Sequence, residues 1–370
     1  MLVASLSLLT AVSAFGSSEA IDHSREPPPV AAPAPAADPA ITPAQRALAA
    51  SLSLVPGLVL HGAGNFALGR RDTAYRLLAA EGVGIGLLGT GGAILVLTGA
   101  ARDWVAPAAL LGVAGAGLFT TSWLLDIYSV WAPDGGFGTP SELRPWLVGS
   151  LGYAHVYDPQ FAYRNFLVSE LEARIQRVSF DAELWASPDD ENYRTQLTTT
   201  LRALGQTGDR RGISDGSALD VRLELGRHSY AAEQFSIMSV GWAFRGRLDL
   251  FHYDRFLAGT FAELEAGHAQ QVFQWSAPAV SSNEDLLLLR FGLGSYLGNH
   301  EPCGGEIQLY YDHRHDGYAA GLLVPGLGSG VLGHVGLEGE YYWSETIGAG
   351  LLMEAGSAYV TALSVKMRAR

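Results

Sequence analysis

Residues 238–250, MSVGWAFRGRLDL, alternate between apolar and polar or small side chains, apart from Gly246. One parity comprises Met238, Val240, Trp242, Phe244, Leu248 and Leu250, and the other comprises Ser239, Gly241, Ala243, Arg245, Arg247 and Asp249. Successive side chains of a β-strand point to opposite faces of the sheet. The stretch therefore predicts a strand with one face in an apolar medium and the other in a polar medium.

The same two-residue rhythm recurs through the last two-thirds of the chain, for example in residues 219–226, 331–343 and 359–368. Strands of soluble proteins average about five or six residues, whereas strands that cross a bilayer need about nine to eleven. At about 18 residues for a strand with its turn, region 144–370 accommodates about twelve strands, an even number that a single-chain barrel can close. The sequence predicts a mainly β fold, a transmembrane antiparallel β-barrel of about twelve strands preceded by an N-terminal α-helical hairpin.

The composition is that of a protein surrounded by lipid. Charged residues make up 16% of the chain, against about 25% in a typical soluble domain, and hydrophobic residues reach 48%. The formal net charge of −13, without clusters of Lys and Arg, argues against a nucleic-acid partner. The single cysteine, Cys303, excludes an internal disulfide framework. We expect membrane lipids around the protein, other envelope proteins as candidate partners, and no cofactor.

The first 41 residues predict export and a tether. Residues 1–20 form an apolar stretch that ends in small residues, which is typical of a signal peptide. Residues 21–41 contain the Pro/Ala-rich run EPPPVAAPAPAADPA, which favours an extended polyproline conformation and cannot bury apolar surface. We interpret this second segment as a linker.

Residues 42–135 predict a helical, membrane-associated hairpin. Thr42, Pro43 and Gln45 form a capping-box start for a helix that Pro56 ends. The uncharged segments 82–101 and 104–125 are each about long enough to cross a bilayer core. Arg102 and Asp103 are expected in the turn between them. Small residues spaced by four predict the packed helix faces: Gly82, Gly86, Ala108, Gly112 and Ala116.

The start of this module resembles small bacterial membrane-hairpin domains. In those domains, a Pro-Gly pair, spaced glycines and an aromatic residue precede the first spanning helix. The matching positions here are Pro56, Gly57, Gly62, Gly64, Phe66 and Gly69. The resemblance covers about a fifth of the chain and implies a membrane hairpin without an assigned chemistry.

The alternating region resembles Gram-negative outer-membrane β-barrels as a superfamily, at the level of pattern rather than motif. The resemblance covers residues 144–370 and implies location in the cell outer membrane, with the apolar parity facing lipid and the polar parity facing the barrel interior. A porin-like role in small-solute passage is one expectation that follows from it.

The inward parity carries charges of both signs. We expect a lumen charge network made of Glu170, Glu172, Arg174, Arg177, Asp181, Arg222, Glu224, Arg245, Arg247, Arg290, Glu338 and Glu340. The same parity also includes Glu183, Arg202, Asp220, Asp249, Glu263 and Glu265. At about twelve strands the lumen lies between ligand-holding small barrels and aqueous porins, so paired charges predict a closed or narrow barrel.

One tract suggests two kinds of chemical site, a metal site and a hydrolase site. In DHRHD, His313, His315 and Asp316 are weak candidates for metal ligands in a loop. The longer tract YYDHRHDGYAAGLLVPG is similar to the active-strand region of outer-membrane lipid A deacylases and phospholipases, through His313, Asp316, Ala319, Ala320, Pro325 and Gly326. The nucleophilic Ser of that pattern is replaced by His315, which removes the acyl-enzyme route. We therefore expect neither a metal site nor a catalytic site.

These observations favour an outer-membrane barrel of structural, envelope-complex or small-solute transport role, without catalytic activity. Two alternatives stay open at this point. The two apolar segments could anchor the chain in the inner membrane, with a periplasmic β domain, or the barrel could be a lipid hydrolase of the lipid A deacylase kind.

Overall fold

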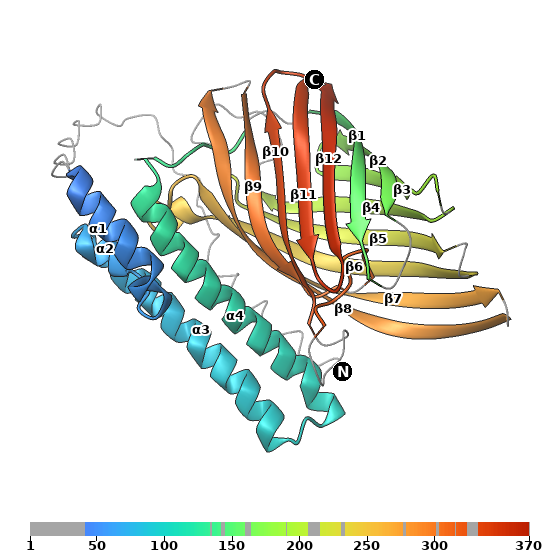
Figure 1. The fold of residues 1–370 in the computed structure, drawn as a ribbon, viewed down its shortest axis with the longest axis horizontal. Coiled ribbons are helices and arrows are strands. Elements are labelled where there is room, and N and C mark those ends of the chain that lie inside the picture. Colours follow the sequence, from blue (N-terminus) through green and yellow to red (C-terminus); the bar gives the residue numbers. More distant parts are fainter. Residues whose placement is uncertain are drawn as a thin grey trace, which may run out of the picture. The chain divides into compact units, whose positions relative to one another are not determined.

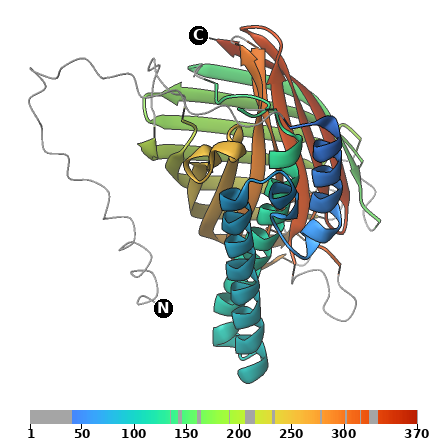
Figure 2. The same cartoon turned by 90° about the vertical axis from the view of Figure 1, so that its left-hand side faces the viewer.

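The computed structural model describes residues 41–370, apart from 134, 142–144, 160–163, 190, 206–214, 231–233, 277–278, 301–302, 315, 324–331 and 370. The predicted signal peptide and nearly all of the predicted linker lie outside these residues. Thr42–Arg370 form one compact unit. Helices come first along the chain and strands follow (Figures 1 and 2).

The helical module contains four α-helices and one 3-10 turn. They are α1 (Pro43–Leu54), η2 (Pro56–Leu58), α2 (Ala63–Ala67), α3 (Arg71–Leu97) and α4 (Arg102–Trp131). At the start of α1, the Thr42 hydroxyl accepts from the Gln45 amide at 3.3 Å, and the Gln45 side chain accepts from the Thr42 amide at 2.9 Å. This reciprocal pair confirms the predicted capping box.

Twelve antiparallel strands close into a barrel, in which each strand pairs with its neighbours along the chain and β1 pairs with β12. The strands are β1 (Leu147–Tyr157), β2 (Asn165–Ile175), β3 (Val178–Ala186), β4 (Tyr193–Gly205), β5 (Ala218–Tyr230), β6 (Phe235–Asp249), β7 (Thr260–Ser276), β8 (Ala279–His300), β9 (Cys303–Asp312), β10 (His334–Tyr342), β11 (Ile347–Ala355) and β12 (Tyr359–Ala369). The predicted fold class and strand number are confirmed. The short turns η3 (Leu250–His252) and η4 (Arg255–Leu257) connect β6 to β7.

The outer surface of the barrel is apolar because one parity of each strand turns large hydrophobic side chains outward. Val240 is 59% exposed, Leu223 is 57% exposed and Leu363 is 62% exposed. Exposed side chains of this kind on a closed barrel match the lipid-facing band of transmembrane barrels. Closure also gives every strand a partner on both sides, which leaves no open sheet edge in hydrocarbon.

The helices α3 and α4 pack through glycines that let their backbones approach closely. A Cβ added to Gly91 would lie 2.6 Å from the Ala108 carbonyl oxygen, and one added to Gly115 would lie 2.6 Å from the Gly84 carbonyl oxygen. The predicted face of Gly82 and Gly86 is wrong, since an added Cβ there meets nothing within 4 Å. Gly84 and Gly91 are seven residues apart and share the buried stripe, whereas the predicted pair points away from it.

The hairpin turn also differs from the prediction. Residues 98–101 make the turn, with Gly99 and Ala100 at positive φ, and the Thr98 amide donates to the Ile94 carbonyl. Arg102 and Asp103 belong to the first turn of α4 instead. A carboxylate is favourable there because the helix N-terminus carries partial positive charge.

A buried polar core explains the spaced glycines and the asparagine before α3. Asp126 of α4 is fully buried and accepts from the Gly64 amide (3.1 Å), the Asn65 amide (3.2 Å) and the Asn65 side chain (2.7 Å). These bonds satisfy free N–H groups at the start of α2. His61 contacts the Ser122 hydroxyl at 2.6 Å, which fastens the same segment to α4.

The helical module lies against the outside of the barrel at β8 and at the connection between β6 and β7. Thr73 donates to Asp254 (2.9 Å), and Tyr128 donates to the Ala258 carbonyl (3.0 Å). A Cβ added to Gly117 would lie 2.8 Å from the Phe291 ring. The hairpin therefore runs beside the wall, starting at the barrel end where β1 begins and β12 ends, which we call the terminal end (Figure 2).

We expect Gly91→Leu to destabilise the helical hairpin by about 1–3 kcal/mol or more, because the added side chain collides with backbone atoms that cannot rotate away. The measurement is thermal loss of helical circular dichroism in detergent micelles. Gly86→Leu is the matched control, since it adds the same side chain to the same helix in open space. Equal melting temperatures for the two variants would contradict the packing described here.

Candidate functional site

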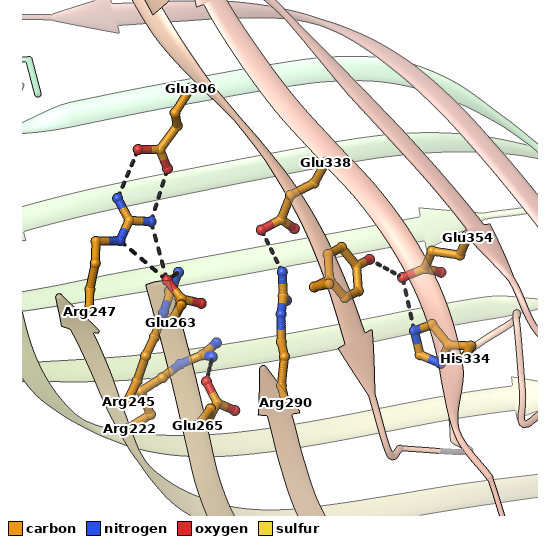
Figure 3. A network of polar contacts seen from close by, with 11 residues as sticks. Arg222, Arg245, Arg247, Glu263, Glu265, Arg290, Glu306, His334, Glu338 and Glu354 are labelled. Carbon is orange, nitrogen blue, oxygen red and sulfur yellow. Dashed lines mark hydrogen bonds and ion pairs between the residues drawn. The ribbon is translucent and has the colours of Figure 1, made fainter. Parts of the chain in front are cut away.

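Charged side chains gather on the strand face opposite the apolar belt, and their contacts show that this face is the barrel interior. Arg222 of β5 donates to Glu265 of β7 at 2.5 Å, although β6 lies between these strands. Arg290 of β8 donates to Glu338 of β10 at 2.5 Å, across β9. Side chains that bridge an intervening strand must meet on the concave side of a closed sheet (Figure 3).

Glu263 on β7 is the centre of one buried ion-pair group. Its carboxylate accepts from Arg245 at 2.7 Å and from Arg247 at 3.2 Å, and its side chain is 1% exposed. Arg247 also donates both terminal nitrogens to Glu306 of β9, at 2.8 and 3.0 Å, and its guanidinium lies 4.0 Å from the centroid of the Phe261 ring. One guanidinium thus joins carboxylates from β7 and β9 (Figure 3).

A second group joins the last strands to the first ones. The Lys366 ammonium of β12 lies 2.8 Å from Glu340 and 4.0 Å from Glu170. The Ser150 hydroxyl donates to Glu170 at 3.2 Å. On the neighbouring strands, Glu354 accepts from Tyr310 at 2.7 Å and lies 3.4 Å from His334. Polar side chains from most of the strands therefore meet inside.

The β9–β10 loop folds into the opposite mouth of the barrel, and we call its residues 313–314 and 316–323 the plug. Arg314 donates to Glu224 of β5 at 2.6 Å and to Asp316 at 3.0 and 3.1 Å. Asp316 in turn accepts from Gln271 of β7 at 3.0 Å. Burial alone would raise the pKa of the Asp316 carboxyl, but the adjacent Arg314 guanidinium outweighs burial and holds that pKa well below its usual range.

Tyr318 anchors the plug in an aromatic cluster. Its ring centroid lies 4.5 Å from that of Phe166, 5.3 Å from that of Trp185 and 4.7 Å from that of His228. The Tyr318 hydroxyl donates to Asn192 at 3.1 Å. Ala319 and Tyr318 are 0% and 4% exposed. The plug is therefore packed against the wall and excludes water from it.

Below the plug, toward the terminal end, the interior holds a cavity of about 360 Å³. Its lining includes Ser150, Val168, Glu170, Glu183, Trp185, Arg245, Glu306, Gln308, Glu338, Glu340, Gly350, Leu352, Ala362, Ser364 and Lys366. Trp185 belongs both to this lining and to the cluster around Tyr318, so the cavity begins where the plug ends. Its volume falls within the range of small-molecule sites.

The predicted lumen residues can now be placed. Those that make ion pairs in the interior are Arg222, Glu224, Arg245, Arg247, Arg290, Glu338 and Glu340. Glu172 and Arg174 pair with each other at 2.6 Å, and Arg202 pairs with Asp220 at 2.8 Å. Asp181 and Glu183 share the inner face of β3. The role of the set in closure or conduction stays a prediction.

Arg177 is placed elsewhere. It lies in the turn between β2 and β3, next to Gln176 at positive φ, where it is exposed and donates to the Ala203 carbonyl at 3.3 Å. A tight turn interrupts the alternation of faces, so strand parity could not be carried through it.

Several residues of the interior were missing from the predicted network. They are Glu306, Lys366, Arg314, Gln308, His334 and Glu354. Lys366 stood on the polar parity of its strand and could have been included. Glu306 lies at the glycine-rich start of β9, where alternation is hard to recognise, and Arg314 lies beyond the end of that strand.

The structure separates the residues of the DHRHD tract. His313 hydrogen-bonds to the Tyr311 hydroxyl at 3.0 Å, while Asp316 is engaged by Arg314 and Gln271. Among the described residues, no group of three or more His, Cys, Asp or Glu side chains is arranged to hold a metal ion. His315, Pro325 and Gly326 lie outside the described residues.

We expect Glu263→Gln to lower the free energy of unfolding of the barrel by about 3 kcal/mol, because Arg245 and Arg247 would lose a buried counter-charge. The measurement is unfolding by urea in detergent. The folded fraction is determined from the difference in gel mobility between unheated and heated samples. Glu284→Gln is the matched control, since Glu284 is exposed on β8, and we expect it to stay within about 0.5 kcal/mol of the parent. Equal losses would contradict a stabilising network.

Comparisons with known proteins add little beyond architecture. No known protein family and no curated protein matches the chain. Among solved structures, it is similar to the KdgM porin in complex with disordered oligogalacturonate, with 7% identity and a TM-score of 0.37, over 60% of this chain and 99% of that one.

Two further structures show the same level of similarity. One is the translocator domain of autotransporter NalP from Neisseria meningitidis, with 12% identity and a TM-score of 0.34, over 71% of this chain and 98% of that one. The other is Omp33 from Acinetobacter baumannii, with 8% identity and a TM-score of 0.29, over 62% and 100%. Likeness at this level transfers no activity.

The chain's own geometry decides its class. An even number of antiparallel strands closes into a barrel, apolar side chains cover the outside, and charges fill the inside. A closed barrel with this distribution of side chains can span lipid, because every strand is paired and the apolar face points outward. The protein is a closed antiparallel β-barrel of the membrane-spanning type.

Proposed function

We propose that the protein is a narrow small-solute transport barrel, closed at one mouth by the plug, and that it carries out no covalent chemistry. In this role, a solute enters the charged interior and crosses the outer membrane when the plug moves. The proposal rests on the cavity of about 360 Å³ inside the barrel, whose lining includes charged side chains from several strands.

The cavity results from the side chains on the inner face. Ser150, Gly152, Gly350 and Ser364 lie on β1, β11 and β12, where larger residues would fill the interior. A barrel that served only as a structural post would gain dispersion and packing energy from a filled core. Small residues here leave a polar space that a hydrated or hydrogen-bonding solute can occupy.

The plug has the features of a closing element. Three of its side chains hold it to the wall. Arg314 contacts β5, Asp316 contacts β7, and Tyr318 contacts the connection between β3 and β4. Loops held by a few specific contacts open at lower free-energy cost than strands of the barrel itself. In outer-membrane barrels, long loops face the exterior and short turns face the periplasm, so we assign the plug mouth to the outside.

A scaffold role in an envelope complex is the second candidate. The helical module favours this role, because α3 and α4 lie against one section of the outer wall. Their outward surface could bind another envelope protein. A scaffold would give no current in a bilayer. A hydrolase role has less support, since His313 contacts Tyr311 and the position of the nucleophilic Ser is occupied by His315.

The test is single-channel recording in planar bilayers with Arg314→Gln. This change removes the guanidinium that ties the plug to Glu224 and Asp316, so we expect an increase in open probability of about tenfold or more, equivalent to one lost interaction of about 1.4 kcal/mol. Arg227→Gln is the matched control, because Arg227 lies on the same strand as Glu224 but is exposed on the outer face.

The parent protein is expected to show rare openings and Arg227→Gln to behave like it. If neither the parent nor Arg314→Gln conducts, although both show heat-modifiable mobility, transport is excluded and the scaffold role is favoured.

A further inference from the structure

Four carboxylates form a block on the inner face of β2 and β3. Glu170 lies directly opposite Glu183, and Glu172 lies directly opposite Asp181. Side chains in such cross-strand pairs have Cβ atoms about 4.5–5.5 Å apart, and like charges at this separation destabilise a sheet. The effective dielectric constant of a protein interior is lower than that of bulk water, which strengthens such repulsion.

The cations near this block are fewer than its carboxylates, and two of them are shared with carboxylates outside it. Lys366 lies 2.8 Å from Glu340 but 4.0 Å from Glu170, and Arg174 pairs with Glu172 at 2.6 Å. Arg194 donates to Gln196 at 2.8 Å, and its charge acts on both Glu183 and Asp316. Glu183 accepts from the Trp185 indole at 2.5 Å, which is a neutral donor. The pair of Glu170 and Glu183 therefore has a surplus of negative charge.

This pair forms one side of the interior cavity, and an uncommitted amide lies on another side. Gln308 of β9 lines the same cavity and is 3% exposed. Neither its side-chain oxygen nor its side-chain nitrogen has a hydrogen-bond partner among the described residues. A buried amide without partners costs about 1–3 kcal/mol, and a polar ligand in the cavity would supply the missing partners.

The shape and composition of the cavity select the kind of cation. The described residues form no cluster that could hold a metal ion, and a volume of about 360 Å³ exceeds that of a bare ion many times. The Trp185 indole, beside the two carboxylates, offers an aromatic surface of the kind that attracts cations. A molecule with a positive group and a short carbon chain would use the two carboxylates, the indole surface and the volume of the cavity.

We propose that this cavity is a binding site for a small organic cation, an amine or guanidinium compound, whose charged group lies between Glu170 and Glu183 and whose other end reaches Gln308. The inference rests on the proposed transport function and names the class of solute that the barrel takes. The charged group would replace the repulsion between the two carboxylates by two charge-assisted hydrogen bonds.

The experiment measures binding to the full-length protein in detergent, by isothermal titration and by thermal unfolding. The probe is putrescine, and butane-1,4-diol is the matched neutral compound with the same carbon chain. We expect putrescine to bind and to raise the unfolding temperature, and butane-1,4-diol to do neither. Glu183→Gln should weaken putrescine binding at least tenfold, and Glu170→Gln should do the same.

The two variants also carry a test without ligand. Because each removes one of two facing like charges, we expect each to unfold at a higher temperature than the parent protein when putrescine is absent. Glu284→Gln, outside the cavity, should change neither binding nor unfolding temperature.

Three results would overturn the proposal: equal effects of putrescine and butane-1,4-diol, no effect of either, or binding that survives both cavity substitutions. The second result would indicate that a proton shared by the two carboxyls already relieves the repulsion. Binding in detergent needs no movement of the plug, so putrescine binding without bilayer current would reject transport and keep the site. Current without putrescine binding would keep transport and reject the site.

Discussion

The pairing of β1 with β12 is the interaction on which the structure depends. It extends from Leu147 opposite Ala369 to Tyr157 opposite Tyr359 and turns an open sheet into a barrel. In hydrocarbon an unpaired backbone group costs several kcal/mol, so an open sheet with two free edges would not be stable there. Closure also defines an inside and an outside, and the alternation of side chains then distributes apolar residues and charges between them.

The charges inside stabilise the fold only as a connected set. Burying a guanidinium or carboxylate without a partner is far more costly than any single ion pair gains. Arg247 meets this constraint by joining Glu263 to Glu306, and Arg314 meets it by joining the plug to β5. The facing pair of Glu170 and Glu183 departs from this rule, which is why it suggests a ligand rather than a structural role.

The sequence predicted the barrel, its strand number and the helices before it, because period-two alternation and long apolar runs are local properties. Residues such as Arg222 and Arg290 were assigned to the interior for the same reason. The ion-pair partners of these residues were not predictable. Arg222 meets Glu265 across an intervening strand, and the register of the strands cannot be determined from any short stretch of sequence. Likewise, the glycines that pack α3 on α4 depend on helix rotation, which favoured Gly84 over Gly82.

The plug marks another limit of sequence reasoning. His313 and Asp316 are close in the chain, and this proximity made them candidate metal ligands together with His315. In the structure His313 contacts the Tyr311 hydroxyl, whereas Asp316 is bound by Arg314 and Gln271. Both residues lie in the loop after β9, where the alternation of a strand no longer predicts the direction of a side chain.

The position of α3 and α4 on the wall has a consequence for assembly. The section of the perimeter at β8 is covered by protein, through Gly117 against Phe291 and through the contacts around Ala258. Neighbouring molecules in the bilayer would then approach the barrel from the remaining strands, so the perimeter is not equivalent around its circumference. The hairpin thus keeps neighbouring molecules away from one side of the barrel and gives the barrel a defined orientation toward them.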